Sequence, residues 1–367
     1  MFLRAIGLIN RKRDAWHTGN ETMNVGSERD SSKASAMMPF DSDLPPEVRH
    51  RVSMTVSCRD TDSVPKVPQA GEVVEQAGER VQIMHEGTRV IADGYCGGWM
   101  TAVIHGLRGH HEPQEELLFH HLLAHVRPDS LMVELGSYWA YYTNWYLGAV
   151  PGSRAICVEP DPAHLELGRR NLDLNDRSAT FVQAFVGRRT AAPDGCVWDF
   201  STPEVDSLDC LDMDALLDRA GGDAIEMLHM DVQGYEMAFI ESMRRAVLAD
   251  KVRFIVVSTH HESISGSPTT HADCLAALTA IGATVFAEHD AFQSYSGDGL
   301  IVASFSQADR RIVLPGISRN VREQSLFPAD PAAIVASSPR GWLQRKVANL
   351  SRWSRKLLRG STGCRAA

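Results

Sequence analysis

From residue 131 onward, short apolar runs alternate with amphipathic segments, and this alternation constrains the fold more than any other feature. Five runs are typical of strands: residues 131–135, 155–160, 180–187, 225–232 and 254–259. The first of them, LMVEL, lacks polar alternation, which indicates a strand covered on both faces. Segments of helical periodicity lie between the runs, among them residues 162–174 and residues 236–248. We therefore expect an α/β fold with a doubly wound, mostly parallel sheet.

Two further apolar runs complete the predicted sheet. ATVFAEHD and GLIVASF are separated by the turn-rich stretch AFQSYSGD, so we expect them to form an antiparallel pair and a seven-stranded sheet. Such a closing hairpin distinguishes the Rossmann-like fold of S-adenosylmethionine-dependent methyltransferases from dinucleotide-binding domains. The dinucleotide fingerprint GxGxxG is also absent after the first strand. Both observations count against a nicotinamide-dependent oxidoreductase, which is one alternative class.

The chain divides into four predicted parts. Residues 1–79 are rich in Ser, Gly, Pro and charge and are predicted to be a weakly ordered lead. Residues 80–130 contain a predicted hairpin around Glu86-Gly87 and a helix that begins near Pro113. The core is predicted over 131–310, and a C-terminal extension over 311–367.

The distribution of charge separates the body of the chain from its C-terminal end. The formal net charge is −9, but the last 37 residues hold eight Lys or Arg and no acidic residue. The remainder carries 29 basic against 46 acidic residues, which argues against a nucleic acid partner. Within the basic end, residues 341–360 have the pattern of a basic amphipathic helix. Such a helix could lie on an anionic membrane surface or dock on the acidic body.

Other features favour a cytoplasmic protein with, at most, peripheral membrane contact. No apolar run approaches the ~18 residues that span a bilayer. The beginning, MFLRAIGLIN followed by RKRD, places its charges on the wrong side of an apolar run for a secretory signal. The seven cysteines are scattered without a CxxC pair, as expected for reduced thiols rather than a disulfide framework.

The candidate site residues follow the strands, because doubly wound sheets bind ligands beyond the carboxyl ends of their strands. Gly136, just past the first strand, allows a sharp turn and close approach of the backbone to a ligand. Glu159 ends the second strand, where a carboxylate can accept hydrogen bonds from both hydroxyls of a ribose. Taken alone, these features are also compatible with a tight turn and a solvated glutamate.

Three sequence motifs in this region together resemble those of the FkbM methyltransferase family. The stretch from Glu134 to Ala140 matches its first motif, D-I-G-A-N-x-G; AICVEPDPAHLELGRRNLDLN matches the second block; and DVQGYE, from Asp231, matches D-V-E-G-x-E. The likeness runs from about His110 to Phe305. It implies S-adenosylmethionine as cofactor and methylation of an oxygen on a sugar or secondary metabolite. The implied cofactor-binding residues are Glu134, Gly136, Ser137, Tyr138, Glu159, Pro160, Asp161 and Gln183.

Three positions depart from the family's motifs. Tyr138 and Ala140 replace the Asn and the final Gly of the first loop, and Gln233 replaces a Glu. The ring of Tyr138 must point away from the cofactor or stack on it. A first loop that no longer admits the cofactor would leave a non-catalytic binding module, which is the alternative function.

The acceptor side needs a base, because methylation of an alcohol releases a proton. Asp231, His260 and His261 follow the fourth and fifth strands and are the predicted catalytic residues. Alternation along a strand predicts that the two histidines point in different directions. Metal ligands could also be sought among His260, His261, Glu262 and His271. Their spacing is not that of a closed metal site, so no metal is predicted. The predicted partner is a small-molecule or glycan hydroxyl acceptor.

Overall fold

The computed structural model describes residues 46–187 and 208–327. Its main element is a seven-stranded sheet with the order β11-β12-β10-β9-β4-β5-β6. The strands are β4 (Leu131–Leu135), β5 (Arg154–Val158), β6 (Thr180–Val182), β9 (Ile225–Met230), β10 (Val252–Thr259), β11 (Thr284–His289) and β12 (Gly299–Ser304). The five neighbouring strands β10, β9, β4, β5 and β6 are parallel to one another. β12 is antiparallel to both β10 and β11. The predicted sheet with its closing hairpin is therefore confirmed.

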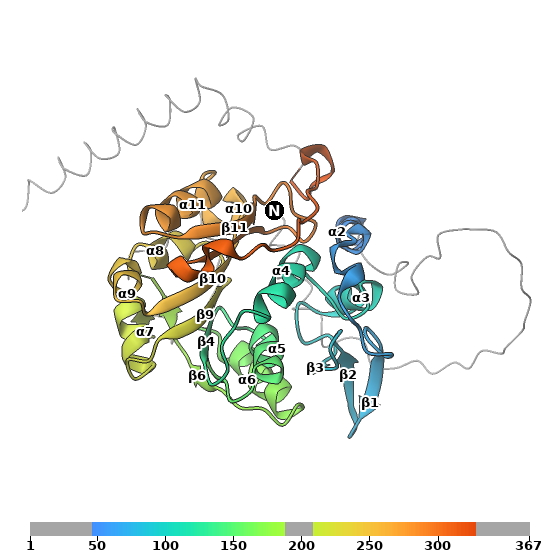
Figure 1. Cartoon of the computed structure of the whole chain (residues 1–367). Coiled ribbons are helices and arrows are strands. Elements are labelled where there is room, and N and C mark those ends of the chain that lie inside the picture. Colours follow the sequence, from blue (N-terminus) through green and yellow to red (C-terminus); the bar gives the residue numbers. More distant parts are fainter. Residues whose placement is uncertain (1–45, 188–207, 328–367) are drawn as a thin grey trace, which may run out of the picture.

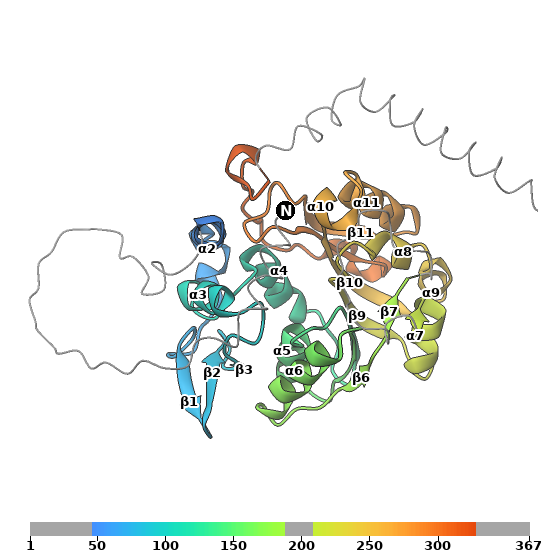
Figure 2. The ribbon, with the colours of Figure 1, turned by 180° about the vertical axis from the view of Figure 1, so that it is seen from behind.

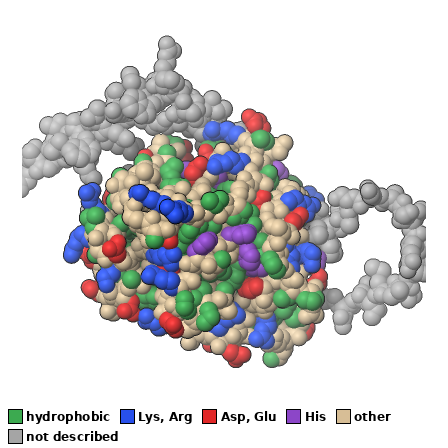
Figure 3. Space-filling model, in the orientation of Figure 1, with side chains coloured by type: hydrophobic (Ala, Val, Ile, Leu, Met, Phe, Trp, Pro, Cys, Tyr) green, Lys and Arg blue, Asp and Glu red, His purple; other side chains and the backbone are tan. Residues whose placement is uncertain are grey.

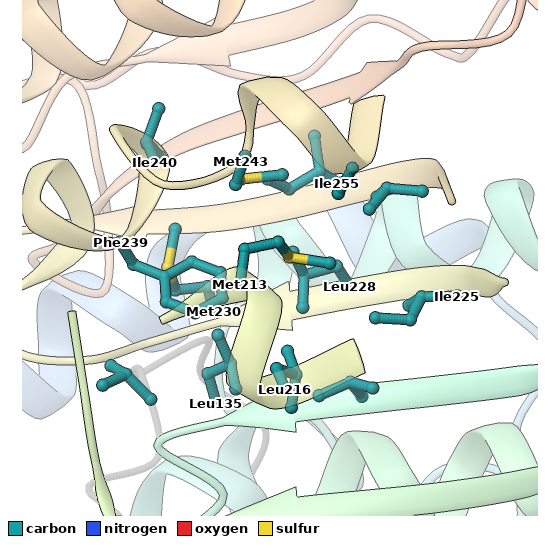
Figure 4. Close-up of a cluster of buried hydrophobic side chains, with 14 of the residues drawn as sticks. Leu135, Met213, Leu216, Ile225, Leu228, Met230, Phe239, Ile240, Met243 and Ile255 are labelled. Atoms are coloured by element: carbon teal, nitrogen blue, oxygen red, sulfur yellow. The ribbon is translucent and has the colours of Figure 1, made fainter. Parts of the chain in front are cut away.

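Helices cover both faces of this sheet, as the two opposite views show (Figures 1 and 2). Alternation along β10 sends Ile255 and Val257 into one core and Phe254 and Val256 into the other. The first core packs α7 (Met213–Arg219), α8 (Glu236–Ile240), α9 (Arg244–Leu248) and α11 (Thr270–Ala280) against the sheet. Figure 4 shows part of it, with Met213 and Leu216 facing the strand residues Leu228 and Met230.

The second face carries an additional layer formed by the part of the chain that precedes β4. The layer contains α2 (Pro46–Ser57), η2 (Asp60–Ser63), β1 (Val73–Gln76), β2 (Glu79–Ile83), β3 (Arg89–Ile91), α3 (Gly98–Gly106) and α4 (Pro113–Leu123). Its apolar residues share one core with α5 (Tyr141–Ala149) and with the sheet. In Figure 1 this blue and teal layer lies beside α5.

The structure corrects the predicted boundary at residue 79. Glu79 is the first residue of β2, which pairs with β1 in one small sheet, so the boundary falls inside an ordered unit. Residues 46–79 were predicted to be weakly ordered because their polar and proline-rich composition gives no core of its own. They are ordered because α2 packs on α3 and places Val52 in the shared core.

Two predicted elements are each divided in the structure. The strand predicted over 180–187 consists of β6 and, after a break, β7 (Phe185–Val186), which pairs with β8 (Cys210–Leu211) in a separate two-stranded sheet. The helix predicted from residue 236 forms α8 and α9. The other predicted elements occur where expected, including α6 (Pro162–Asp173) and the β2–β3 hairpin.

Three segments lie outside the described residues: 1–45, 188–207 and 328–367. The predicted basic amphipathic helix at 341–360 belongs to the last of them. No helix within 46–187 and 208–327 is long and apolar enough to cross a membrane.

Candidate active site

The loop after β4 is held tightly against the end of β9. Gly136 has φ +75°, and a Cβ atom at this position would lie 1.7 Å from the carbonyl oxygen of Asp231. The N–H groups of Gly136 and Ser137 both donate to the carbonyl of Val158 at the end of β5. The loop therefore bridges three neighbouring strand ends, and only glycine fits at its first position.

The two departures from the family motif adopt left-handed backbone conformations. Tyr138 has φ +40° and Ala140 has φ +56°, although neither is a glycine. The ring of Tyr138 stacks on His164 with 3.5 Å between ring centroids. On its other side, Tyr95 contacts Tyr138 edge-on and stacks on Trp139 at 4.5 Å. The ring of Tyr138 thus packs between His164 of α6 and Tyr95, which follows β3.

Glu159 links this loop to the beginning of α6. Its Oε2 accepts a hydrogen bond from the N–H of Tyr138 at 3.2 Å, and its Oε1 accepts one from the N–H of Asp161 at 3.0 Å. His164 Nδ1 lies 3.5 Å from Oε1. The carboxylate is largely buried at the end of β5, the position predicted for an acceptor of ribose hydroxyls.

The predicted residues Pro160, Asp161 and Gln183 lie together beside Glu159. Gln183 Nε2 donates to the carbonyl of Pro160 at 3.1 Å, which joins the ends of β5 and β6. Asp161 caps α6, because its Oδ1 accepts from the N–H groups of Ala163 and His164. The structure therefore brings seven of the eight predicted cofactor-binding residues to the carboxyl ends of β4, β5 and β6.

Glu134, the eighth, lies within β4 and faces the beginning of α5. Its Oε2 accepts from the N–H of Thr143 at 3.0 Å, so its carboxylate satisfies a free N–H of the first helical turn. Burial raises the pKa of Glu134 to about 7. Its contact in this structure is with the helix; a contact with the cofactor stays a prediction.

Asp231, His260 and Asp298 meet at the carboxyl edge of β9 and β10. His260 Nδ1 lies 2.6 Å from Glu236 Oε1, while its Nε2 lies 3.1 Å from Asp231 Oδ1 and 3.6 Å from Asp298 Oδ1. Burial lowers the pKa of His260, but the carboxylates of Glu236, Asp298 and Asp231 outweigh burial and hold it well above its ordinary value. These carboxylates therefore favour the protonated form of His260.

His261 points away from this cluster, as the alternation along the strand predicts. It is the N-cap of α10 (Glu262–Ser265), with Nδ1 accepting from the N–H of Ser263. Its ring stacks on Phe327 with centroids 3.8 Å apart. The geometry thus separates the two predicted histidines: His260 joins Asp231, whereas His261 caps a short helix.

A belt of buried polar residues before and within α4 lies next to Asp231, and sequence reasoning missed it. Glu116 accepts hydrogen bonds from the N–H groups of His111 and Glu112, and its carboxylate also contacts the side chains of His110 and His111. Burial lowers the pKa of His111, but Glu112 and Glu116 outweigh burial and raise it to about 10. Five consecutive or near-consecutive His and Glu residues, HHEPQEE, were the available signal.

One group of three potential metal ligands lies close together within the described residues: His85, His110 and Glu116. The rings of His85 and His110 are stacked, with centroids 4.1 Å apart and planes 20° apart. Their nitrogen lone pairs lie in near-parallel planes, so they do not converge on one ion. Figure 3 shows a group of histidine side chains on one face of the molecule. His121 in α4 and His125 just after it are exposed.

The fold and this edge of the sheet define the class of the protein. The strand order, with β12 inserted antiparallel between β10 and β11, is that of class I methyltransferases. A glycine loop after the first strand and a carboxylate at the end of the second fit an adenosine-bearing cofactor. The protein is an S-adenosylmethionine-dependent methyltransferase.

The comparison with protein families agrees with the sequence motifs. Residues 124–285 match the model of the methyltransferase FkbM domain, which confirms the resemblance found in the sequence. No curated protein matches the chain.

Solved methyltransferases resemble about half of the chain. A precorrin-6y C5,15-methyltransferase from Geobacter metallireducens GS-15 is 14% identical, with 52% of this chain and 86% of that one covered and a TM-score of 0.32. An O-methyltransferase from Bacillus cereus in complex with SAH is 17% identical, with 52% and 79% covered and a TM-score of 0.33. A SAM-dependent methyltransferase from Aquifex aeolicus is 8% identical, with 53% and 94% covered and a TM-score of 0.31.

Asn171 of α6 connects the cofactor loop to the N-terminal layer. Its Nδ2 donates to the carbonyl of Trp139 at 2.9 Å, and its Oδ1 accepts from the N–H of Ile91 in β3 at 2.8 Å. One turn later, Asn175 bonds both backbone groups of Arg89 in the same strand. Both amides hydrogen-bond to the backbone of β3, but of the two only Asn171 contacts the loop.

We expect Asn171→Ala to weaken the affinity for S-adenosylmethionine by about tenfold, because a buried loop carbonyl loses its donor at a cost of about 1–3 kcal/mol. Asn175→Ala is the matched control: it should lower the thermal midpoint through β3 and leave the dissociation constant within about twofold. Calorimetric titration of both variants measures this difference. Equal effects of the two changes on affinity would show that the Trp139 contact is irrelevant to the loop.

Proposed function

We propose that this methyltransferase transfers a methyl group to a hydroxyl of a sugar or a small metabolite. The observation that carries the proposal is the pair of partly exposed carboxylates, Asp231 and Asp298, beside His260 at the acceptor side of the cofactor loop. An alcohol must lose a proton during methylation, and carboxylates at this edge provide groups that can accept it. The family resemblance implies the same class of acceptor.

The residues that would hold S-adenosylmethionine surround the ends of β4 and β5. Glu159 would bind the ribose hydroxyls, Gly136 and Ser137 would allow close approach of the backbone, and Pro160, Asp161 and Gln183 would lie against the adenine. The cofactor supplies an activated methyl group on a positively charged sulfur. The chain's own contribution is alignment of the acceptor for in-line displacement and a net negative charge at the acceptor edge.

The test is methyl transfer from cofactor labelled in its methyl group to a mixture of unprotected monosaccharides and their glycosides. We expect label in alkali-stable methyl ethers. Asp231→Asn should lower the rate at least about 100-fold, because Asp231 borders the acceptor edge and partners His260. Label found only in alkali-labile esters or on nitrogen, or no transfer to any hydroxyl, would contradict the proposal.

A further inference from the structure

The burial of His260 decides which side chains of the cluster can reach an acceptor. The side chain of His260 has 0% exposure, whereas those of Asp231 and Asp298 are 22% and 18% exposed. His260 lies beneath the two carboxylates, with its ring fixed by Glu236. It holds a positive charge below them and cannot itself touch a hydroxyl group in this arrangement.

Asp298 is far from His260 and Asp231 in the sequence and reaches the cluster through the pairing of β12 with β10. It directly precedes β12, and Gly299 pairs with Thr259 at the end of β10. Because β12 is antiparallel to β10, the residue before Gly299 lies beside the residue after Thr259, which is His260. The sheet itself therefore places Asp298 at the acceptor edge, although no motif marks it.

The two aspartates differ in their partners. Asp231 Oδ1 accepts a hydrogen bond from Gln233 Nε2 at 2.9 Å and lies near His260 Nε2. Asp298 has a longer ion pair with His260, at 3.6 Å. Contacts that stabilise a carboxylate make it a weaker base. Asp231 is thus the better fixed anion and Asp298 the better proton acceptor.

We propose that Asp298 is a catalytic residue of this methyltransferase, the general base that accepts the proton of the acceptor hydroxyl. This inference rests on the proposed function. The acceptor oxygen forms a bond to the methyl carbon, the electron pair of the broken sulfur–carbon bond stays on sulfur, and the hydroxyl proton passes to the Asp298 carboxylate. His260 acts as a positioning residue, because its charge orients both aspartates.

The environment of Asp298 suits a base at neutral pH. Burial raises the pKa of Asp298 to about 7; Asp231 and Glu112 add to this effect, and His260 and Arg51 oppose it. The charged and titratable groups around it come from several elements: Arg51 of α2, Tyr95 and Cys96 after β3, Glu112 before α4, Asp231 after β9 and His260 after β10. A base is most effective when its pKa lies near the working pH.

A nuclear magnetic resonance titration tests the ionisation of Asp298 without any acceptor. The full chain is labelled with ¹³C at the aspartate side-chain carboxyl carbons and titrated from pH 4 to 9, together with Asp298→Asn. We expect one carboxyl signal to titrate near pH 7 in the intact protein and to be absent from the variant. If the signal lost in the variant titrates below pH 5, the proposal is wrong.

The kinetic test uses the alcohol acceptor identified with labelled cofactor. The intact enzyme should gain rate as the pH rises through about 7 and then reach a plateau, because the base must be deprotonated. Asp298→Asn should lower kcat about 100-fold or more, abolish this rise and leave the affinity for S-adenosylmethionine within about threefold. Asp250→Asn, at an exposed position with φ +53° that Asn tolerates, should behave as the intact enzyme.

The outcomes separate the two proposals. An Asp298→Asn variant that keeps the pH-dependent rise would overturn the role of Asp298 while leaving methyl transfer to a hydroxyl intact. An intact enzyme that methylates no hydroxyl would contradict the proposed function and with it the role of Asp298 as a base for that reaction.

Discussion

Replacing Gly136 by alanine should lower the free energy of unfolding by about 2–5 kcal/mol and abolish measurable binding of S-adenosylmethionine. The added Cβ would lie 1.7 Å from the carbonyl oxygen of Asp231, and the backbone there has φ +75°. Relief requires the loop to move away from β9, which displaces the N–H groups that now bond the end of β5. Urea unfolding and calorimetric titration measure the two effects.

Gly221→Ala is the matched control for this change. Gly221 also has a positive φ, of +67°, but a Cβ atom there would meet nothing within 4 Å. We expect a loss of only about 1 kcal/mol, from backbone strain alone, and unchanged cofactor binding. If both variants lose the same stability and both bind the cofactor, the contact between the loop and Asp231 does not limit the site.

Replacing Glu159 by alanine should weaken the affinity for S-adenosylmethionine by about tenfold to 150-fold, as the loss of a charged hydrogen bond of about 1.5–3 kcal/mol implies. The carboxylate lies at the end of β5 and also holds the N–H groups of Tyr138 and Asp161. Its removal takes away both the acceptor for the ribose and the support of the loop. Calorimetric titration with the cofactor measures the change.

Glu159→Gln and Glu166→Ala complete this test. The glutamine variant keeps one oxygen for the loop but loses the charge, so its affinity should lie between those of the intact protein and the alanine variant. Glu166 is exposed on α6 and should be replaceable without effect. Unchanged affinity in Glu159→Ala would mean that the cofactor's ribose is bound elsewhere.

Much of the fold could be predicted because buried strands and amphipathic helices leave clear periodic patterns. LMVEL coincides with β4, and the helix predicted from Pro162 begins at that residue, where Asp161 supplies the cap. The break between α8 and α9 was not visible, because helical periodicity continues across Met243, which is itself buried. The local sequence pattern predicts that a helix or strand exists more reliably than it predicts where that element is interrupted.

The site could be predicted only where its residues directly follow strands within motifs. Glu159 and Gly136 fall in this group. Asp298 could not be identified, because it joins His260 through antiparallel pairing of β12 with β10, a long-range register that no local pattern specifies. The burial of His260 beneath the aspartates is likewise a property of packing, and it is one observation from which we propose a carboxylate as the base.

The most direct test of the central claim is calorimetric titration of the intact chain with S-adenosylmethionine. We expect saturable binding at one site per chain. The ring of Tyr138 stacks on His164, and the carboxylate of Glu159 stays at the end of β5, where it is proposed to bind the ribose. Absence of binding would contradict this account: the Tyr138 and Ala140 substitutions would then have closed the loop, and the domain would be a methyltransferase fold without its cofactor.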